Sequence, residues 1–485
     1  MFTRRTLLTA GAVTTGVIAM PRLLGPAEEG GHAAHGSNWV QEMAHRKAVR
    51  PSGEPFTVAM PVPATARPVS TDGGVDRYQI GIQPATLEIL PGRMSTALTY
   101  GGAMVGPTIR ACGNRPVEVT FANGIEAPTN VHLHGGHVPA ASDGHPMDLI
   151  TPGGTRAYQY PNTQRGATLW YHAHGHQTEA EQTYRGLAGF YIIDDARERA
   201  LGLPSGQYDV PISLRDAAFD EAGQLIPGNT PDDRTTILVN GRPQPYFRVA
   251  ARKYRLRLLN SANERVLKLN IGGATMVQIG TDGGLLPAPV ERSEVQITSG
   301  ERVDIVFDFG RYAPGTQVVL ADAVAGPLLR FDVVRRVWDS STVPSQLRAA
   351  PALGTATVER DVAFSFDLTG YPIGLVNGQT FDHNRVDFRI KRNTTEIWKV
   401  TNADGDFGVP HNFHMHLTQF RVLDRDGAAP SLDDAGLKDT INVPPGTSAR
   451  IQATFGGDFL GRYMYHCHFL EHSALGMMAQ MEIVD

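Results

Sequence analysis

A pattern that recurs three times along the chain is the feature that most restricts its fold. Each copy contains a short β-like stretch, a basic or glycine-containing turn, and a second β-like stretch that ends in asparagine. The copies are Thr108–Asn123, Phe247–Asn260 and Phe388–Asn402. They recur at intervals of roughly 140 residues, which is the size of one compact domain. The chain is therefore expected to contain three related units.

A second marker has the same period. Strand-like runs led by a glycine begin at Gly154, Gly300 and Gly446. The 52 glycines and 33 prolines, with only 19% charged residues, indicate a turn-rich β protein without long amphipathic helices. The one short helix expected is 179–185. Two markers in one register predict three consecutive β-sandwich units.

The expected organisation places a targeting segment ahead of these units. Arg4 and Arg5 precede a short apolar run, which is too short to span a membrane and resembles a twin-arginine export signal. Export to the periplasm or exterior, through export machinery, would follow. The predicted divisions are a signal peptide (1–27), a linker (28–55), and three domains (56–200, 201–350 and 351–485).

Charge and cysteine content exclude several classes of protein. The formal net charge of −5 is mild for 485 residues and predicts no nucleic-acid partner. No stretch after the signal approaches a membrane span, so no stable membrane span is expected. Two cysteines exclude a disulfide-built scaffold. Cys112 is expected to be a buried free thiol.

Histidine is the residue that points to chemistry, because seventeen histidines accompany two cysteines. Eight of them form four His-x-His pairs, and alternate residues of a strand share one face. Two pairs fall in the first unit and two in the third. Eight imidazoles exceed the needs of a single metal ion and predict a polynuclear site between these units. The pairs are His132/His134, His172/His174, His414/His416 and His466/His468.

Cys467 lies between two of these histidines and must face the other way on a regular strand. His411 likewise faces away from His414. His472 and Met477 follow Cys467 by five and ten residues. One cysteine, two histidines and a methionine form the ligand set of an electron-transfer copper site. Zinc is the alternative for His/Cys ligands, but four His-x-His pairs do not have a zinc-ribbon spacing.

These motifs resemble those of three-domain multicopper oxidases, of the bacterial laccase type that includes spore-coat laccases and bilirubin oxidases. The pattern HCHxxxHxxxxM is intact from His466 to Met477, and the runs TILVNGRPQPY, QIGTDGGLLP and GRYMYHCH are also similar. The resemblance covers nearly all of the chain after about residue 78. It implies an all-β fold of three cupredoxin-like Greek-key β-sandwich domains.

The resemblance also implies four copper ions per chain, and a role for each matched residue. A type 1 copper would accept electrons singly from a small aromatic donor, and dioxygen would be reduced to water at one type 2 and two type 3 ions. Cys467 and His472 would thus take part in catalysis. The type 1 ligands would be His411, Cys467, His472 and Met477; the type 2 ligands His132 and His414; the type 3 ligands His134, His172, His174, His416, His466 and His468.

Two further positions concern protons. Asp143 matches a carboxylate that lies near the type 2 copper in the family, which implies a proton relay; a turn aspartate before Gly144 is the simpler interpretation. Many bacterial members have Glu directly after the histidine matched by His472, whereas this chain has Ser473. The hypothesis is that Ser473 and an ordered water replace that carboxylate.

The electron donor is the point that the sequence leaves open. It is expected to dock at an exposed edge of His472, between loops of the second and third units that include 371–382 and 404–409. Phenols or other aromatic compounds are the leading donor class, and a metal ion such as Cu(I) is the alternative. A non-enzymatic envelope scaffold is a third possibility, but a scaffold has no need of this complete set of histidines and Cys467.

Overall fold

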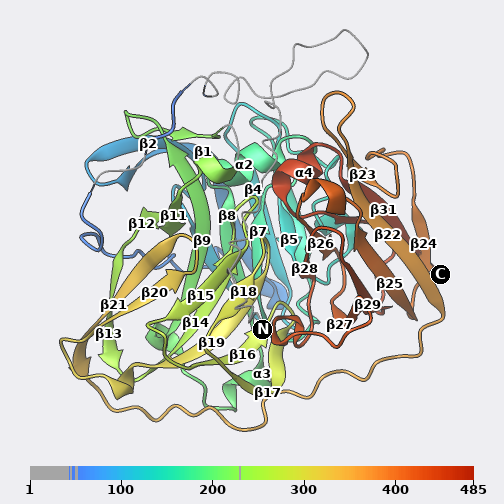
Figure 1. Cartoon of the computed structure of the whole chain (residues 1–485). Coiled ribbons are helices and arrows are strands. Elements are labelled where there is room, and N and C mark those ends of the chain that lie inside the picture. Colours follow the sequence, from blue (N-terminus) through green and yellow to red (C-terminus); the bar gives the residue numbers. More distant parts are fainter. Residues whose placement is uncertain (1–42, 44–45, 50–52, 229–230) are drawn as a thin grey trace, which may run out of the picture.

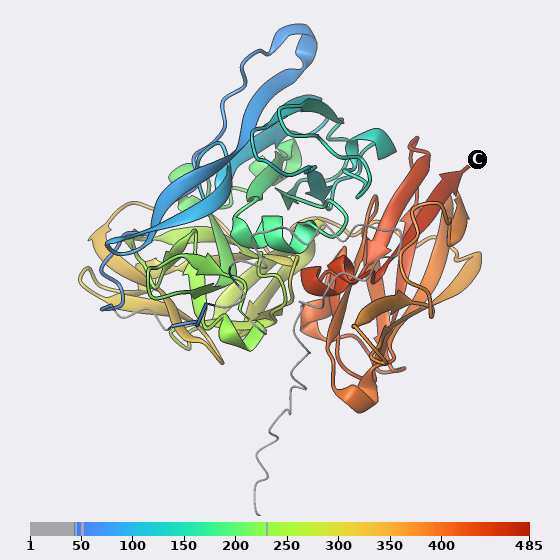
Figure 2. The same cartoon turned by 90° about the horizontal axis from the view of Figure 1, so that it is seen from above.

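The computed structural model describes residues 43, 46–49, 53–228 and 231–485. The predicted signal peptide and most of the predicted linker lie outside these residues. Figures 1 and 2 show three lobes, blue to teal, green to yellow and orange to red, that meet around a common centre. Each lobe is a β-sandwich, so the predicted all-β, cupredoxin-like fold is confirmed. No helix within the described ranges is long and apolar enough to cross a membrane.

The first sandwich contains two four-stranded sheets that share one apolar core. In spatial order, one sheet contains β2 (Arg93–Tyr100), β1 (Asp76–Leu90), β4 (Val117–Asn123) and β6 (Thr155–Tyr160). The other contains β3 (Gly106–Cys112), β8 (Ala188–Asp194), β7 (Ala167–His172) and β5 (His132–His134).

The second sandwich pairs an eight-stranded sheet with a five-stranded one. The larger contains β12 (Arg242–Pro243), β11 (Thr236–Val239), β9 (Asp209–Phe219), β14 (Lys253–Asn260), β19 (Arg302–Asp308), β16 (Met276–Thr281) and β17 (Gly284–Arg292), with β10 (Leu225–Ile226) beside β9. The smaller contains β13 (Tyr246–Ala251), β21 (Gly326–Arg336), β20 (Gln317–Asp322), β15 (Leu267–Ile271) and β18 (Val295–Ile297).

The third sandwich contains two five-stranded sheets. One contains β23 (Ile373–Val376), β22 (Val358–Asp367), β25 (Thr394–Asn402), β29 (Ser448–Phe455) and β27 (Phe420–Arg425). The other contains β24 (Phe388–Lys391), β31 (Met478–Val484), β30 (Gly461–His466), β26 (His411–Met415) and β28 (Thr440–Val443).

The sequence repeat corresponds to a repeated pairing of strands. In each sandwich the first strand of one sheet runs parallel to the strand that ends in the repeated asparagine: β1 with β4, β9 with β14, and β22 with β25. Asn123, Asn260 and Asn402 each donate from the side-chain amide to two later backbone carbonyls, 2.7–3.0 Å away. The repeated asparagine thus holds the end of its strand to two later segments of the chain in all three units, since buried backbone carbonyls need hydrogen-bond donors.

Three short α-helices interrupt the sheets of the described chain: α2 (Glu179–Arg185), α3 (Ala196–Arg199) and α4 (Leu470–Ala474). The first of them confirms the helix predicted at 179–185. Helices α2 and α4 touch at the upper end of the molecule in Figure 1, where the lobes meet in the view of Figure 2. The expectation of a buried thiol at Cys112 is wrong, because alternation along β3 turns Ala111 inward and Cys112 outward.

Candidate metal centres

The four His-x-His pairs come together through strand pairing within each sandwich. In the first sandwich β5 runs antiparallel to β7, which places His132 opposite His172. In the third, β26 runs antiparallel to β30, which places His414 opposite His466. All eight rings are at most 1% exposed. Each sandwich therefore presents a buried face with several imidazoles.

These two faces meet each other. The ring of His132 stacks on that of His416 with centroids 3.8 Å apart, and His134 stacks on His414 at 3.7 Å. The Nε2 atom of His466 lies 3.1 Å from that of His174. The eight imidazoles thus form one cluster between the first and third sandwiches. Further ring contacts join His468 to His134 at 4.8 Å and to His172 at 5.3 Å.

The hydrogen bonds of this cluster fit metal coordination. One nitrogen of most rings is held by a protein acceptor, as when His132 Nδ1 donates to the Asp143 carbonyl and His172 Nδ1 to that of Ala173. The opposite nitrogen is buried without a protein partner among the described residues. Orphaned polar atoms of this kind need an explanation, and a bound metal ion provides one. The orphaned atoms include His132 Nε2, His134 Nδ1, His172 Nε2, His414 Nε2 and His468 Nε2.

Burial also keeps these rings in the form that binds metals. Burial, with repulsion from His174, lowers the pKa of His172 to about 3. Burial lowers the pKa of His466 to about 4. The rings are therefore neutral at physiological pH, with a lone pair available for a metal ion. Groups of three donor atoms within 4.8 Å of one another include His132/His134/His172, His132/His414/His416 and His174/His416/His466.

Asp143 touches two rings of this cluster. Its Oδ2 atom accepts a hydrogen bond from His416 Nδ1 at 2.7 Å, and its Oδ1 atom lies 3.7 Å from His132 Nδ1. Burial raises the pKa of Asp143 well above its usual range. The carboxyl group therefore orients at least one ring, and its position suits the proposed exchange of protons with the cluster.

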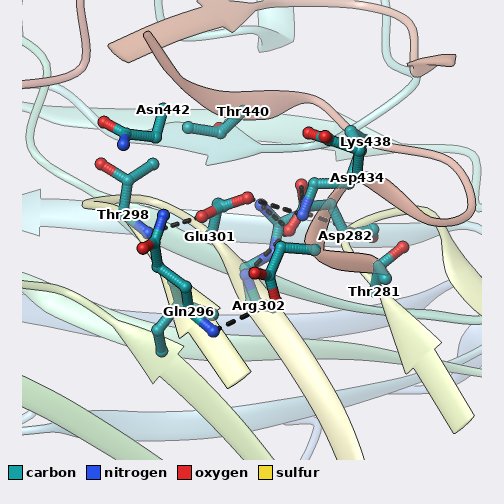
Figure 3. A network of polar contacts seen from close by, with 12 residues as sticks. Thr281, Asp282, Gln296, Thr298, Glu301, Arg302, Asp434, Lys438, Thr440 and Asn442 are labelled. Carbon is teal, nitrogen blue, oxygen red and sulfur yellow. Dashed lines mark hydrogen bonds and ion pairs between the residues drawn. The ribbon is translucent and has the colours of Figure 1, made fainter. Parts of the chain in front are cut away.

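A charged network from the second and third sandwiches, which includes Asp282, Arg302 and Lys438 (Figure 3), contacts the cluster through Asp439. Asp439 Oδ1 accepts a hydrogen bond from His134 Nε2 at 3.0 Å, and its backbone carbonyl accepts one from His414 Nδ1 at 2.8 Å. The Arg302 guanidinium donates two hydrogen bonds, of 2.7 and 2.6 Å, to the same carboxylate. Asp282 completes the network with contacts to Arg302 and Lys438. Sequence spacing had not revealed any of these four charged residues.

The repeated glycine of the second unit reaches the cluster as well. A Cβ atom built on Gly300 would lie 3.0 Å from His134 Cε1 and 3.0 Å from His468 Nδ1. Its φ angle of 88° is also one that side chains disfavour. The second sandwich therefore closes the cluster with backbone, where a larger residue would displace the rings.

Cys467 belongs to a second, separate group of donors in the third sandwich. Its Sγ atom lies 3.8 Å from His411 Nδ1 and 3.6 Å from His472 Nδ1, and the two nitrogens are 3.0 Å apart. All three side chains are fully buried. Met477 is fully buried, and its backbone carbonyl accepts a hydrogen bond from the Cys467 amide at 3.2 Å. A soft thiolate with two imidazoles suits copper.

Two carboxylates orient the histidines of this second group. Asp404 accepts a hydrogen bond from His411 Nε2 at 2.9 Å, and Glu264 accepts one from His472 Nε2 at 3.1 Å. Burial alone would raise the pKa of Cys467, but the charge of His472 and hydrogen bonds from both histidines lower it to about 6. The thiol is therefore largely ionised at neutral pH, as a metal ligand must be.

The structure changes one expectation about this group. His472 was expected to have an exposed edge, but the side chain is fully buried and Glu264 covers its Nε2 atom. Glu264 comes from the second sandwich and is itself 13% exposed. No spacing pattern indicates this residue, because it lies far from His472 in the sequence. Glu264 therefore separates the ring from solvent.

Cys467 connects the two groups through the backbone. Its neighbours His466 and His468 belong to the eight-ring cluster, while its own side chain belongs to the second group. The Cys467 carbonyl also accepts a hydrogen bond from His466 Nδ1 at 2.9 Å. A covalent path and a hydrogen-bonded path therefore run from the sulfur to the cluster.

Comparison with known families and structures gives a consistent result. Three family models described as multicopper oxidase match residues 81–198, 215–327 and 349–485. A laccase of Bacillus stratosphericus is 34% identical, over 89% of this chain and 99% of its own length.

Solved structures agree in fold. The crystal structure of a multi-copper oxidase from Pediococcus acidilactici superposes with a TM-score of 0.82 and 33% identity, over 91% of this chain and 94% of that chain. A multicopper oxidase from Campylobacter jejuni, described as a metallo-oxidase, superposes with a TM-score of 0.80 and 26% identity, over 91% and 98% of the two chains.

Proposed function

Because this chain belongs to the multicopper oxidase family, as a bacterial laccase-type member, we propose that it couples one-electron oxidation of phenolic or other aromatic donors to four-electron reduction of dioxygen to water. The protein is a copper-dependent oxidoreductase. The observation that carries the proposal is the position of Cys467, whose sulfur lies in one donor group while its two neighbours lie in the other. A passive copper store has no need of this connection.

Four copper ions, when bound, would supply the one-electron transfers and the reduction of dioxygen. We assign one to His411, Cys467, His472 and Met477, and three to the eight-ring cluster, with His132 and His414 on the type 2 ion. The chain's own part is to hold the donor atoms in place. Asp143, Asp439 and the backbone carbonyls fix the ring tautomers, and burial excludes water and competing reactions.

The donor would meet the protein at Glu264. Its carboxylate bonds to His472 Nε2 and is partly open to solvent, so a phenolic hydroxyl that binds it is held beside the ring. Asp404, at the start of the segment 404–409, bonds to His411, the other histidine of this group. Glu264 can also accept the proton that a phenol loses on oxidation.

Replacing Glu264 with glutamine is expected to raise KM for a methoxyphenol by roughly 10- to 100-fold, since a hydrogen bond to a charged group contributes about 1.5–3 kcal/mol. Steady-state kinetics with the phenol and with ferrocyanide measure this effect. Ferrocyanide has no hydroxyl and is an anion, so its KM should not rise. The matched control is Glu294→Gln, which removes an exposed carboxylate from the same sandwich. An equal rise for both donors would contradict docking at Glu264.

A metal ion is the second candidate donor. One structural neighbour is described as a metallo-oxidase, and the partly exposed carboxylate of Glu264 gives a cation an electrostatic contact beside His472. Oxygen uptake by the copper-loaded protein separates the two. With a methoxyphenol, we expect four donor electrons per dioxygen and no peroxide. Uptake with Cu(I) alone would move the assignment to metal-ion oxidation, and no uptake with either would overturn the oxidase function.

We further propose that the chain is exported, on the basis of Arg4, Arg5 and the apolar run after them. An exported oxidase would meet aromatic donors and dioxygen in the periplasm or outside the cell. Small electron donors and dioxygen are its proposed partners, with no nucleic acid. Replacement of both arginines by lysine should retain the precursor in the cytoplasm, as fractionation would show.

A further inference from the structure

A buried carboxyl group lies beside Ser473, the position at which the sequence departs from its relatives. Glu179 of α2 and Ser473 of α4 are both fully buried. The Ser473 hydroxyl lies 3.1 Å from Glu179 Oε1 and 3.1 Å from the Leu470 carbonyl oxygen, so it can donate its one proton to either. The second carboxyl oxygen, Oε2, has no hydrogen-bond partner among the described residues. The sequence places these residues almost 300 positions apart, so only the fold reveals the pair.

The pair lies where two histidine-bearing segments leave the eight-ring cluster. The amide of Glu179 donates to the Gly175 carbonyl at 3.0 Å, so Glu179 is one helical turn beyond His174. Helix α4 begins two residues after His468 and carries Ser473. Because α2 and α4 are in contact, the carboxyl group lies at the junction of the first and third sandwiches (Figure 2).

No cation is paired with Glu179 within the described part of the chain. The charged group facing it from α4 is Glu471, whose own partner is Arg234 at 2.6 Å. Arg234 also faces Asp216 at 4.0 Å. Burial raises the pKa of Glu179 to about 8, although backbone groups and the Ser473 hydroxyl partly oppose this shift. At neutral pH the group is therefore an uncharged acid that holds a proton.

The other carboxylates near the donor groups are already engaged by a cation or a histidine. Asp439 is held by Arg302, while Asp404 and Glu264 each accept a hydrogen bond from a histidine of the Cys467 group. Asp143 accepts one from His416. Glu179 differs because its one side-chain partner is a hydroxyl, which can itself pass a proton on.

We propose that Glu179, acting through Ser473, is a proton donor for the reduction of dioxygen at the eight-ring cluster. This proposal rests on the proposed function. Reduction of one dioxygen to two waters consumes four electrons from the donor and four protons. Each proton given by Glu179 leaves a carboxylate, which solvent must protonate again before the next transfer. Glu179 of α2 thus provides the carboxyl group that position 473 of α4 lacks.

The test separates electron entry from proton-dependent reoxidation. Copper-loaded Glu179→Gln is first reduced with a methoxyphenol in the absence of oxygen, and the loss of visible absorption is followed. Oxygen is then mixed in, and the recovery of the visible absorption is followed. We expect normal reduction but reoxidation slowed at least about tenfold, the lower end of effects attributed to proton transfer. In the wild type the reoxidation rate should fall as the pH rises through about 8, and this limb should be missing in the variant.

The matched control is Glu181→Gln on the same helix, where the carboxylate pairs with Arg185. It should reoxidise as the wild type does. Infrared spectroscopy gives a readout independent of turnover: one protonated carboxyl band of the wild type should be present at neutral pH, disappear on titration through about 8, and be missing from the spectrum of Glu179→Gln. Thermal unfolding and copper content establish that each variant is folded and loaded.

A second variant moves the carboxyl group to the other end of the same hydrogen bond. Glu179→Gln combined with Ser473→Glu should recover reoxidation, at least in part. Wild-type reoxidation in Glu179→Gln, or no recovery in a fully loaded double variant, would overturn the proposal. Failure of the wild type itself to be reduced by the phenol, or to reoxidise, would instead overturn the proposed function.

Discussion

Replacing Cys467 with serine is expected to abolish the intense visible absorption of the copper-loaded protein and to lower kcat for every donor at least about a thousandfold, a loss of roughly 4 kcal/mol in transition-state stabilisation. The thiolate lies against both His411 and His472, and its pKa is held near 6. Serine provides neither the soft ligand nor the ionised form. Visible spectra, copper analysis and turnover rates measure the result. The copper analysis should show the loss of one copper ion per chain.

The chain provides its own control for this prediction. Cys112 is the other cysteine, and it is free and exposed at the end of β3. Cys112→Ser should keep the absorption, the copper content and the activity. If Cys467→Ser retained the absorption, the sulfur would not be the ligand, and the assignment of the electron-entry site would be wrong.

Replacing Arg302 with methionine is expected to lower the free energy of unfolding by about 3–5 kcal/mol, because it leaves the buried carboxylate of Asp439 without its cation. Arg302 and Asp439 are both fully buried, and Asp282 shares the arginine (Figure 3). The Asp439 carboxylate would then no longer be fixed against His134. Copper should be lost from the eight-ring cluster before it is lost from the Cys467 group.

Denaturant unfolding of the apoprotein and copper analysis by spectroscopic type test this expectation. The control is Arg311→Met, since the Arg311 side chain is 55% exposed and its pair with Asp308 spans 3.9 Å. An exposed pair of this kind contributes at most about 1 kcal/mol. If both variants lost similar stability, the buried network would have no special role.

The site was predictable from the sequence where its geometry is local. Alternation along a strand is enough to place His132 with His134, and to turn Cys467 away from His466, so the donor types and their grouping follow from spacing. The threefold period likewise indicated the sandwiches, and the repeated asparagines have the same hydrogen bonds in each. The short helix at 179–185 was also predicted with its observed bounds.

What could not be predicted depends on contacts between sandwiches. Glu264, Arg302 and Asp439 have no periodic relation to the histidines that they support, because each meets its partner across a domain junction. The same holds for Glu179, which sequence spacing cannot connect with Ser473. The prediction for Cys112 was wrong for a simpler reason. The end of a strand has an inner and an outer face, and the sequence around Cys112 did not indicate on which face the thiol lies.

The shared cluster has a consequence for the order of events during biosynthesis. The hydrogen bond between His134 and Asp439 joins residues 305 positions apart. A ribosome adding about 5–20 residues per second needs roughly 15–60 s to cover such an interval. Throughout that time the first sandwich can fold and expose four of the eight clustered histidines to any available metal ion. Correct loading of the cluster with metal therefore requires the last strands to be synthesised. A chain released early would bind metal ions without forming the complete cluster.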